Sequence, residues 1–500
     1  MPPDAYYLRR KFCKYAQCVD DRFADELRRK FFLSPDHKSL SQQVSQKPNL
    51  IAGIALLTPY NGGNLGDAAI QDAMIDNLRL RLADARFTGI SLDCESFLDR
   101  HGAPGFPLCA TGRPFYEMSS GNVAANPNHG AVHAKDRNVL VGRILGFLKK
   151  LPGLLKLLKK MRRWALILPG EILHCARGYK LLSKQDILIV SGGGQLDEEW
   201  GGSWGHPFAL FKWALLARVA RVPCAFVSVG AGKLKSPVTR LLLFMALRLA
   251  SYHSYRDKNT KAIVATLFKK SVDGEVVPDL AFSLSVAGTP LGAKVRSFSK
   301  DQTVVAIGLI AFAKPGCWPH EDDMLYHRYL RQMARTVSFL MERGHSLIIV
   351  CSSLGDDESV MPDLLECLDE LSQKRFSQQA RISTITTWKE LTATLLEVDY
   401  LIGSRLHTTI FGFLTHKPTI AISFDPKVNW LMQDIGQTDY LLQIRDFTAE
   451  DVLKAIDHIQ LNRLTVVEKI MSYRQKILPG LQGQYDALAR LAGLHRGLQN

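Results

Sequence analysis

The stretch VDYLIGSRLHTTIFGFLTHKPTIAISF, residues 398–424, contains three structural elements in succession. A short apolar run ends at Gly403, an apolar segment of helical length follows, and a second apolar run begins after Pro418. Short apolar runs rich in β-branched residues predict strands, and parallel strands need a crossover connection that is usually a helix. The stretch therefore predicts a strand–helix–strand unit and, with it, an α/β fold built on parallel sheets.

This alternation of strands and helices occurs in two separate series along the chain. Apolar runs at 50–57 and 303–312 each begin a series in which strand-length runs alternate with helical periodicity. Two such series predict two Rossmann-like domains that face a cleft, because parallel α/β sheets bind ligands outside the carboxyl ends of their strands. We expect an N-terminal extension and linker at 1–48, an N-terminal domain at 49–300 and a C-terminal domain with terminal helices at 301–500.

The composition is that of a globular protein with an excess of basic residues. The 500 residues are 46% hydrophobic and carry a formal net charge of +15, which favours an anionic partner. The nine cysteines include no CxxC pair, so we expect reduced thiols in a cytoplasmic protein rather than a disulfide framework or a zinc site. No apolar run approaches the ~18 residues needed to span a bilayer, and we see no signal-peptide core.

Much of the basic charge lies in an irregular and basic amphipathic insertion, which we expect at about 93–183. Its segment LVGRILGFLKKLPGLLKLLKKMRRW, Leu140–Trp164, interleaves leucines with Lys and Arg and contains no acid. Such a segment can lie on an anionic bilayer surface, which predicts peripheral association with the inner face of the membrane. The alternative is a helix that packs on its own domain with its lysines in water. Nucleic acid is a disfavoured partner, because the sequence contains no recognised binding motif.

Two glycine-rich loops follow predicted strands of the N-terminal domain. In NGGNLGD, Asn61–Asp67, the glycines let a ligand approach the backbone, and the helix after Gly66 offers free N–H groups. Asp67 either caps that helix or places a carboxylate in the cleft. In SGGGQLDEEWGG, residues 191–202, carboxylates stand beside tryptophan, which suits the hydroxyl edges and apolar face of a carbohydrate. The alternative for this second loop is an ordinary surface loop.

A third candidate site lies where the helix of the opening stretch begins. Ser404 occupies the expected N-cap position, and Arg405 and His407 fall in the first turn. The helix dipole disfavours cations there and stabilises anions. We therefore expect a phosphate or carboxylate ligand, bound by backbone N–H groups, the hydroxyl and the guanidinium. The alternative is a purely structural role for the arginine and the histidine.

Five motifs occur in the order NLGDAAI, SGGGQLDEEWGG, SYRD, VVPDLAFSL and GSRLHTTIFGFLTHKPTIAISFDPKV. Together they resemble the polysaccharide pyruvyl transferase family over about residues 52–436. The resemblance implies a fold like that of the two-domain, type-B glycosyltransferases. It also implies that pyruvate is transferred from phosphoenolpyruvate onto two hydroxyls of a sugar, which yields a cyclic ketal and free phosphate.

The resemblance implies roles for individual residues on the donor side. Arg405 and His407 match the family's donor-binding and catalytic pair, and Arg256 in SYRD matches another cation that reaches toward the donor. His407 is then the candidate acid that protonates the methylene carbon of the donor, since a flanking phosphate favours the charged imidazole. Ser404 completes the expected donor site.

On the acceptor side of the cleft, Asp67 or one of the acids at 197–199 is the candidate general base. The expected acceptor-binding residues are Asn64, Gly193, Gly194, Asp197, Glu198 and Trp200. We expect no bound cofactor and no metal, with phosphoenolpyruvate as a donor substrate. The expected acceptor is a sugar in a polysaccharide or in a lipid-linked glycan precursor. Nothing in the sequence indicates which sugar, which linkage or which oligomeric state.

Two other functions are compatible with these motifs. A type-B glycosyltransferase that uses a nucleotide sugar would share the architecture and the phosphate site at a helix N-terminus. A non-catalytic protein that binds a membrane surface could keep the fold, although Asp67, Arg256, Arg405 and His407 are all present.

Overall fold

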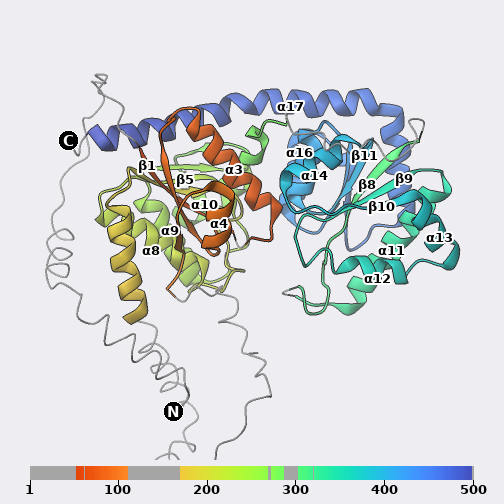
Figure 1. The fold of residues 1–500 in the computed structure, drawn as a ribbon, viewed down its shortest axis with the longest axis horizontal. Helices are drawn as coiled ribbons and strands as arrows, with labels where there is room; N and C mark the ends of the chain where they lie inside the picture. The colour runs from red at the N-terminus through yellow and green to blue at the C-terminus, as the bar shows by residue number, and fades with distance from the viewer. Residues whose placement is uncertain are drawn as a thin grey trace, which may run out of the picture.

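The computed structural model describes residues 52–60, 62–110, 169–268, 272–286, 302–318 and 320–497 (Figure 1). The predictions made for residues 1–48 and for the basic segment 140–164 lie outside these ranges. Within the described residues, no helix combines the length and the apolar character that crossing a bilayer requires.

The first domain is built on a seven-stranded sheet in the order β3-β2-β1-β4-β5-β6-β7, in which every pair of neighbours is parallel. Its strands are β1 (Gly53–Leu57), β2 (Arg86–Ser91), β3 (Gly105–Pro107), β4 (Ile187–Ser191), β5 (Cys224–Val229), β6 (Tyr252–Tyr255) and β7 (Glu275–Val276). Its helices are a segment at 169–182, α3 (Leu65–Arg79), α4 (Cys94–His101), α8 (His206–Val219), α9 (Pro237–Leu249), α10 (Lys258–Phe268) and the 3₁₀ helix η2 (Leu280–Ser283).

The second domain repeats this plan with a six-stranded parallel sheet in the order β10-β9-β8-β11-β12-β13. Its strands are β8 (Val304–Gly308), β9 (Ser346–Val350), β10 (Ala380–Ile382), β11 (Tyr400–Gly403), β12 (Thr419–Ser423) and β13 (Leu441–Gln443). Its helices are α11 (Asp323–Glu342), α12 (Val360–Glu366), α13 (Glu370–Gln379), α14 (Trp388–Leu396), α15 (Leu406–Leu414), α16 (Pro426–Ile435), the 3₁₀ helix η3 (Thr438–Tyr440) and the long α17 (Ala449–Gly497).

Both sheets have the strand order of a Rossmann fold. In each sheet, the chain first adds strands on one side of the first strand and then continues on its other side. The strand order therefore reverses between β1 and β4 in the first sheet and between β8 and β11 in the second. Central strands β4 and β8 are buried along their whole length, which explains why they read as continuous apolar runs. The prediction of an α/β fold with two Rossmann-like domains is confirmed. Ligands of such sheets bind near the point where the strand order reverses.

The two domains are connected by apolar packing and by α17. One cluster of buried apolar side chains continues from α3 of the first domain into the second sheet. Helix α17 extends along both domains (Figure 1), contacting α11 and β12 of the second domain and α3, η2 and β4 of the first. Near its end, Gln484 donates a hydrogen bond of 3.0 Å to the hydroxyl of buried Ser228 of the first domain. The last helix, which the sequence assigned to the C-terminal domain, therefore also packs on the N-terminal one.

Part of the expected irregular insertion is regular structure that belongs to the first sheet. Residues 94–101 form α4, and β3 pairs with β2 at the edge of the sheet. Asp93 caps α4 by accepting a hydrogen bond of 2.9 Å from the N–H of Ser96, and Gly102 ends it with a φ of 62°. The abundance of Gly, Pro and Asn concealed this short unit, although Asp93 and Gly102 are signals of helix start and stop. The expectation of irregular structure is wrong for these residues.

Candidate functional site

The carboxyl ends of the two sheets meet directly, and the site lies at this contact. The N–H of Leu65 donates to the carbonyl of Ser352 at 3.1 Å, and the N–H of Leu354 donates to the carbonyl of Gly63 at 2.9 Å. These backbone hydrogen bonds join the loop after β1 to the loop after β9. The hydroxyl of Thr408 in α15 donates to that of Ser352 at 2.8 Å. The N-termini of α3 and α15 are therefore held against the same loop.

Glycines of the first domain let charged side chains approach its backbone. A Cβ atom built on Gly66 would lie 1.9 Å from Nδ1 of His407, so only glycine leaves space for the imidazole at the start of α3. A Cβ on Gly230, after β5, would lie 2.5 Å from Nη2 of Arg256. The sequence predicted that a ligand would approach the backbone of NGGNLGD closely. In the structure, the imidazole of His407 from the other domain makes this close approach at Gly66.

Three polar side chains lie together at this contact: buried Arg256 after β6, buried Asp279 after β7 and half-buried His407 in α15. Oδ2 of Asp279 is 3.6 Å from Nη1 of Arg256 and 3.6 Å from Nε2 of His407. Burial alone would raise the pKa of Asp279, but His407 and Arg256 outweigh it and hold this pKa below its usual value.

Several polar atoms of this cluster lack a hydrogen-bond partner. In the described part of the chain, Nη2 of Arg256, Oδ2 of Asp279 and Nε2 of His407 are all buried and without one. Buried polar atoms are nearly always hydrogen-bonded, and leaving one unsatisfied costs about 1–3 kcal/mol. The cluster therefore has the donors and the acceptor to hold a further polar molecule. We call Arg256, Asp279 and His407 the cleft triad.

Asp67 lies beside the cleft triad and does not cap its helix. The N-cap of α3 is Asn64, whose side-chain oxygen accepts from the N–H groups of Gly66 at 2.9 Å and Asp67 at 3.4 Å. The capping alternative for Asp67 is therefore wrong, and its carboxyl group is available to the cleft. Burial raises the pKa of Asp67, an effect opposed by the charge of His407 and increased by that of Asp279.

The start of α15 differs from the prediction in two respects. The N-cap residue is Arg405, which makes no side-chain capping hydrogen bond, so the expectation of Ser404 at this position is wrong. Arg405 also has a protein partner: its Nε and Nη2 donate to the two oxygens of Asp357 at 2.6 and 2.7 Å. Asp357 is completely buried. The expectation that only a ligand would compensate this cation is wrong, because Asp357 supplies the negative charge.

The Arg405–Asp357 pair is part of the contact between the domains. Asp357 also accepts hydrogen bonds from the N–H groups of Ser353 at 3.1 Å and Ala311 at 3.3 Å, so it fixes the loop that touches α3. Burial would lower the pKa of Arg405, but Asp357 outweighs it and raises this pKa. Among the described residues, three of the five N–H groups of the guanidinium have no partner, and they remain able to contact a ligand.

The loop at 191–202 places its acids in different surroundings. Asp197 is buried, and its Oδ2 lies 3.8 Å from Nζ of Lys427 in α16, across the contact between the domains. Glu198 instead accepts hydrogen bonds from the N–H groups of Lys235 at 2.8 Å and Ser236 at 3.1 Å, at the start of α9. Partial burial alone would raise the pKa of Glu198, but these hydrogen bonds outweigh it and lower the pKa. Glu198 thus anchors the loop to α9.

Other predicted acceptor residues of this loop lie near the same contact. A Cβ on Gly193 would be 3.5 Å from Oδ1 of Asp67, and one on Gly194 would be 3.5 Å from Nζ of Lys427. Trp200 is 37% exposed. The glycines are therefore neighbours of the charged groups, whereas Trp200 offers an aromatic surface to solvent.

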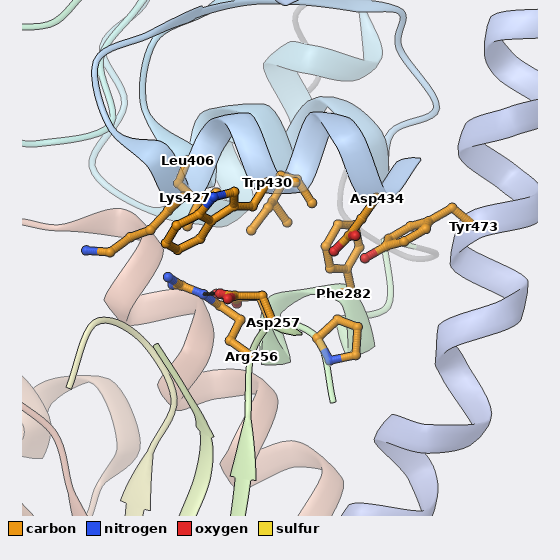
Figure 2. A pocket seen from close by; sticks show the side chains of 12 residues that line it. Arg256, Asp257, Phe282, Leu406, Lys427, Trp430, Asp434 and Tyr473 are labelled. Atoms are coloured by element: carbon orange, nitrogen blue, oxygen red, sulfur yellow. Dashed lines mark ion pairs between the residues drawn. The ribbon is translucent and has the colours of Figure 1, made fainter. Parts of the chain in front are cut away.

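A pocket extends from the cleft triad between the two domains (Figure 2). It is narrow: the room that water-sized molecules could occupy in it amounts to about 20 Å³. Its charged and aromatic lining residues are Arg256, Asp257, Asp279, Lys427, Trp430, Asp434 and Tyr473. Figure 2 shows Lys427 and Trp430 of α16 facing Arg256 and Asp257 of the first domain.

Sequence reasoning did not select Asp279, Asp357, Lys427 or Trp430. Asp279 and Lys427 both occur in motifs that carry the family resemblance, VVPDLAFSL and the end of GSRLHTTIFGFLTHKPTIAISFDPKV. Asp357 follows a predicted strand in the acidic run GDDE, a position at which a carboxylate can reach the edge of the sheet. Nothing in the sequence alone indicates that Trp430 lines a pocket.

The chain resembles known proteins in its fold. A comparison with curated sequences finds no match. Solved structures with a similar fold include a UDP-glucose:anthocyanidin 3-O-glucosyltransferase in complex with UDP, at 12% identity and a TM-score of 0.48, covering 89% of this chain and 100% of the other. Another is the UDP-GlcNAc 2-epimerase of Neisseria meningitidis bound to UDP-GlcNAc, at 10% identity and a TM-score of 0.46, covering 86% and 99%.

The sequence motifs are matched by a family model as well. The model of the family described as polysaccharide pyruvyl transferase matches residues 64–426. This range includes Asp67, the loop at 191–202 and all three residues of the cleft triad. The match covers well over half of the chain, and the protein therefore belongs to the polysaccharide pyruvyl transferase family.

Proposed function

We propose that this enzyme transfers pyruvate from phosphoenolpyruvate onto two hydroxyls of a sugar, forming a pyruvate ketal and releasing phosphate. The acceptor sugar belongs to a polysaccharide or to a lipid-linked glycan precursor. The observation that carries the proposal is the cleft triad, in which nitrogen atoms of Arg256 and His407 are buried between the two domains without hydrogen-bond partners among the described residues. The membership of a transferase family supports the type of reaction.

The donor fits this site by charge. Phosphoenolpyruvate carries a phosphate and a carboxylate, which bind best to guanidinium groups and to helix N-termini. Arg256 lines the pocket with an unpartnered Nη2, and Lys427 lies on the opposite wall. Arg405, at the N-terminus of α15, contributes the N–H groups that Asp357 leaves free. We assign the donor to these three cations.

His407 is the proposed general acid. Asp279 lies 3.6 Å from its Nε2, and Gly66 leaves the space that the imidazole occupies. Protonated His407 gives its proton to the methylene carbon of phosphoenolpyruvate, so the carbon–carbon double bond becomes single and positive charge develops at C2.

Asp67 is the proposed general base. A carboxyl group whose pKa is raised by burial accepts a proton more readily than an ordinary aspartate. The first sugar hydroxyl bonds to C2 and loses its proton, the bond between C2 and the phosphate oxygen breaks, and the second hydroxyl bonds to C2. Asp67 accepts the proton of the first hydroxyl and passes it to the departing phosphate, which leaves as hydrogen phosphate, and the proton of the second hydroxyl restores His407.

The basic segment 140–164 belongs to this proposal as a membrane contact. Its leucines and basic residues suit an anionic bilayer surface, where a lipid-linked acceptor would be located. The protein would then act at the cytoplasmic face of the membrane.

A thermal unfolding series tests the proposed function. We expect phosphoenolpyruvate to raise the Tm of the full chain, because a ligand that binds only the folded state stabilises it. UDP at the same concentration should leave the Tm unchanged. Mass spectrometry of a candidate glycan incubated with enzyme and phosphoenolpyruvate should then detect an added pyruvate ketal. Stabilisation by UDP but not by phosphoenolpyruvate would reject the proposal in favour of a nucleotide-sugar glycosyltransferase.

A further inference from the structure

Helix α9 carries apolar side chains on its outer face that the other described residues leave uncovered. Val238 is 41% exposed and Leu241 is 55% exposed, although both are large aliphatic residues. Together with half-buried Met245 they follow a spacing of three and four residues, so all three lie on one face of the helix. We call these three residues the α9 face. Adjoining apolar side chains at a surface, unlike single ones, indicate a contact with a partner.

The loop that follows residues 191–202 brings an aromatic ring to the same region. The hydroxyl of Ser203 donates to that of Ser236 at 2.9 Å and lies 2.8 Å from that of Thr239, so this loop is held against the start of α9. Trp204 is 54% exposed, and its ring packs on that of Phe208 in the neighbouring helix α8. Tryptophan is enriched where lipid meets water, because its ring is apolar and its N–H is polar.

The charges around the α9 face are all of one sign. Helices α8 and α9 lie side by side (Figure 1), and the sequence contains no aspartate or glutamate from residue 200 to residue 256. The exposed basic residues of this stretch are Arg218, Arg221, Lys233, Lys235, Arg240 and Arg248. None of them forms an ion pair with another described residue. Glu198, which reaches the start of α9, is held there by two backbone N–H groups. A partner for this surface must therefore be both apolar and anionic.

An anionic bilayer meets both requirements. Apolar side chains enter the boundary between headgroups and acyl chains, while Lys and Arg contact the anionic headgroups. The basic segment 140–164 is a poor match for the α9 face, because its charges are also only positive and the two would repel each other. This segment ends five residues before residue 169, where the described chain resumes, and nearby Glu171 accepts a hydrogen bond of 3.0 Å from Lys212 of α8. Segment and face can thus contact the same bilayer.

We propose that the α9 face docks the N-terminal domain on the surface of an anionic lipid bilayer. The loop at 191–202 connects this docked face to the cleft, since Glu198 is bound to the start of α9 and Asp197 lies 3.8 Å from Lys427 of the other domain. A lipid-linked acceptor would therefore enter the cleft along this loop. That consequence rests on the proposed function, whereas the docking itself does not.

Sedimentation of the full chain with phosphatidylglycerol vesicles tests the α9 face. The wild type is compared with Leu241→Glu and with the matched control Leu461→Glu, which introduces the same charge at a leucine of α17 that is 85% exposed. Leu241→Glu should bind at least about tenfold more weakly than the wild type, because it places a carboxylate against anionic lipid, and the control should bind normally.

A second variant tests the charges separately. Lys235→Gln combined with Arg240→Gln keeps the apolar side chains of the α9 face and removes two exposed basic ones. Its affinity for phosphatidylglycerol vesicles should also fall about tenfold, because each basic residue near the surface of an anionic membrane contributes to binding. Circular dichroism verifies that the variants are folded, and this double variant decides the question if Leu241→Glu does not fold.

Each other outcome has a distinct meaning. Normal vesicle binding by both α9 variants would overturn the proposal, as would a wild type that does not bind or an equal loss in Leu461→Glu. If light scattering showed a dimeric wild type and a monomeric Leu241→Glu that still binds vesicles, the α9 face would belong to a second copy of the chain. Phosphoenolpyruvate should raise the Tm of Leu241→Glu as it does that of the wild type. If it stabilises neither while vesicles still require Leu241, the docking surface stands and the proposed function falls.

Discussion

Arg405 and Arg256 were predicted to serve the same ligand, but their surroundings differ. Arg405 donates two short hydrogen bonds to completely buried Asp357. Arg256 lies 3.6 and 3.7 Å from Asp279 and Asp257, too far for hydrogen bonds, and its Nη2 has no partner in the described part of the chain. The first arginine is held by an ion pair within the protein and keeps three N–H groups for a ligand, whereas the second is more deeply buried and makes no hydrogen bond to either neighbouring carboxylate. A cation at a helix N-terminus therefore does not by itself indicate a ligand, because an internal carboxylate can compensate its charge.

Replacing His407 should have the largest effect. In the His407→Gln variant the proposed acid is absent, so we expect kcat to fall about 10³-fold, within the range of 10²–10⁴ that general acid catalysis contributes. Stability should change little, because glutamine still fits beside Gly66. The measurement is phosphate release from phosphoenolpyruvate with a glycan acceptor, and His327→Gln on the exposed face of α11 is the control. Turnover near the wild-type rate would remove His407 from the mechanism.

Replacing Arg405 should mainly cost stability. In Arg405→Gln the buried carboxylate of Asp357 loses its cation, and breaking a buried ion pair by removing one partner costs about 3–5 kcal/mol. Because the guanidinium is partly exposed, we expect the lower end of this range, about 3 kcal/mol, in urea unfolding. Arg335→Gln, which breaks an exposed pair with Glu450, is the matched control and should cost less than about 1 kcal/mol. Equal losses in the two variants would contradict the structural role of Arg405.

Replacing Arg256 should instead mainly cost donor affinity. Its neighbouring carboxylates keep backbone partners, since Asp279 accepts from the N–H of Ala281 and Asp257 from that of Thr260. We therefore expect Arg256→Gln to lose about 1 kcal/mol of stability or less. A hydrogen bond to a charged group contributes about 1.5–3 kcal/mol, so phosphoenolpyruvate should bind roughly 10–100-fold more weakly in calorimetry. The contrast with Arg405 fails if Arg256→Gln is the less stable variant or binds the donor normally.

The sequence could predict what depends on strand periodicity. Apolar runs identify the strands, and the rule that ligands bind at their carboxyl ends places Asp67, Arg256 and His407 at one contact. It could not predict pairings between distant segments: Asp357 is 48 residues from Arg405, and no local pattern indicates that it compensates the charge at α15. The N-cap prediction failed for the same reason. Ser404 satisfies the local rule, but the helix begins one residue later, where Arg405 reaches Asp357.

Replacing Asp67 should have the smallest effect, and this effect should depend on pH. The pKa of Asp67 is raised in the folded state, mainly by burial, so at neutral pH its ionised form opposes folding. This penalty is relieved as the pH falls through the raised pKa, and Asp67→Asn should remove it. We expect Asp67→Asn to be more stable than the wild type at pH 7 by up to about 1 kcal/mol, with the gain vanishing toward pH 4.

Lowering the pH should have opposite effects on stability and on activity: it relieves the stability penalty of Asp67, but it should reduce activity. The proposed base works only when ionised, so kcat/KM of the wild type should fall as the pH drops through the raised pKa of Asp67. Asp67→Asn should be slow at every pH and should lack this acidic limb. Asp76→Asn is the matched control, because burial also raises the pKa of Asp76 but the residue lies three turns into the same helix. If Asp67→Asn were no more stable at pH 7 and kept the acidic limb, another carboxyl group, such as Asp197, would have to be the base.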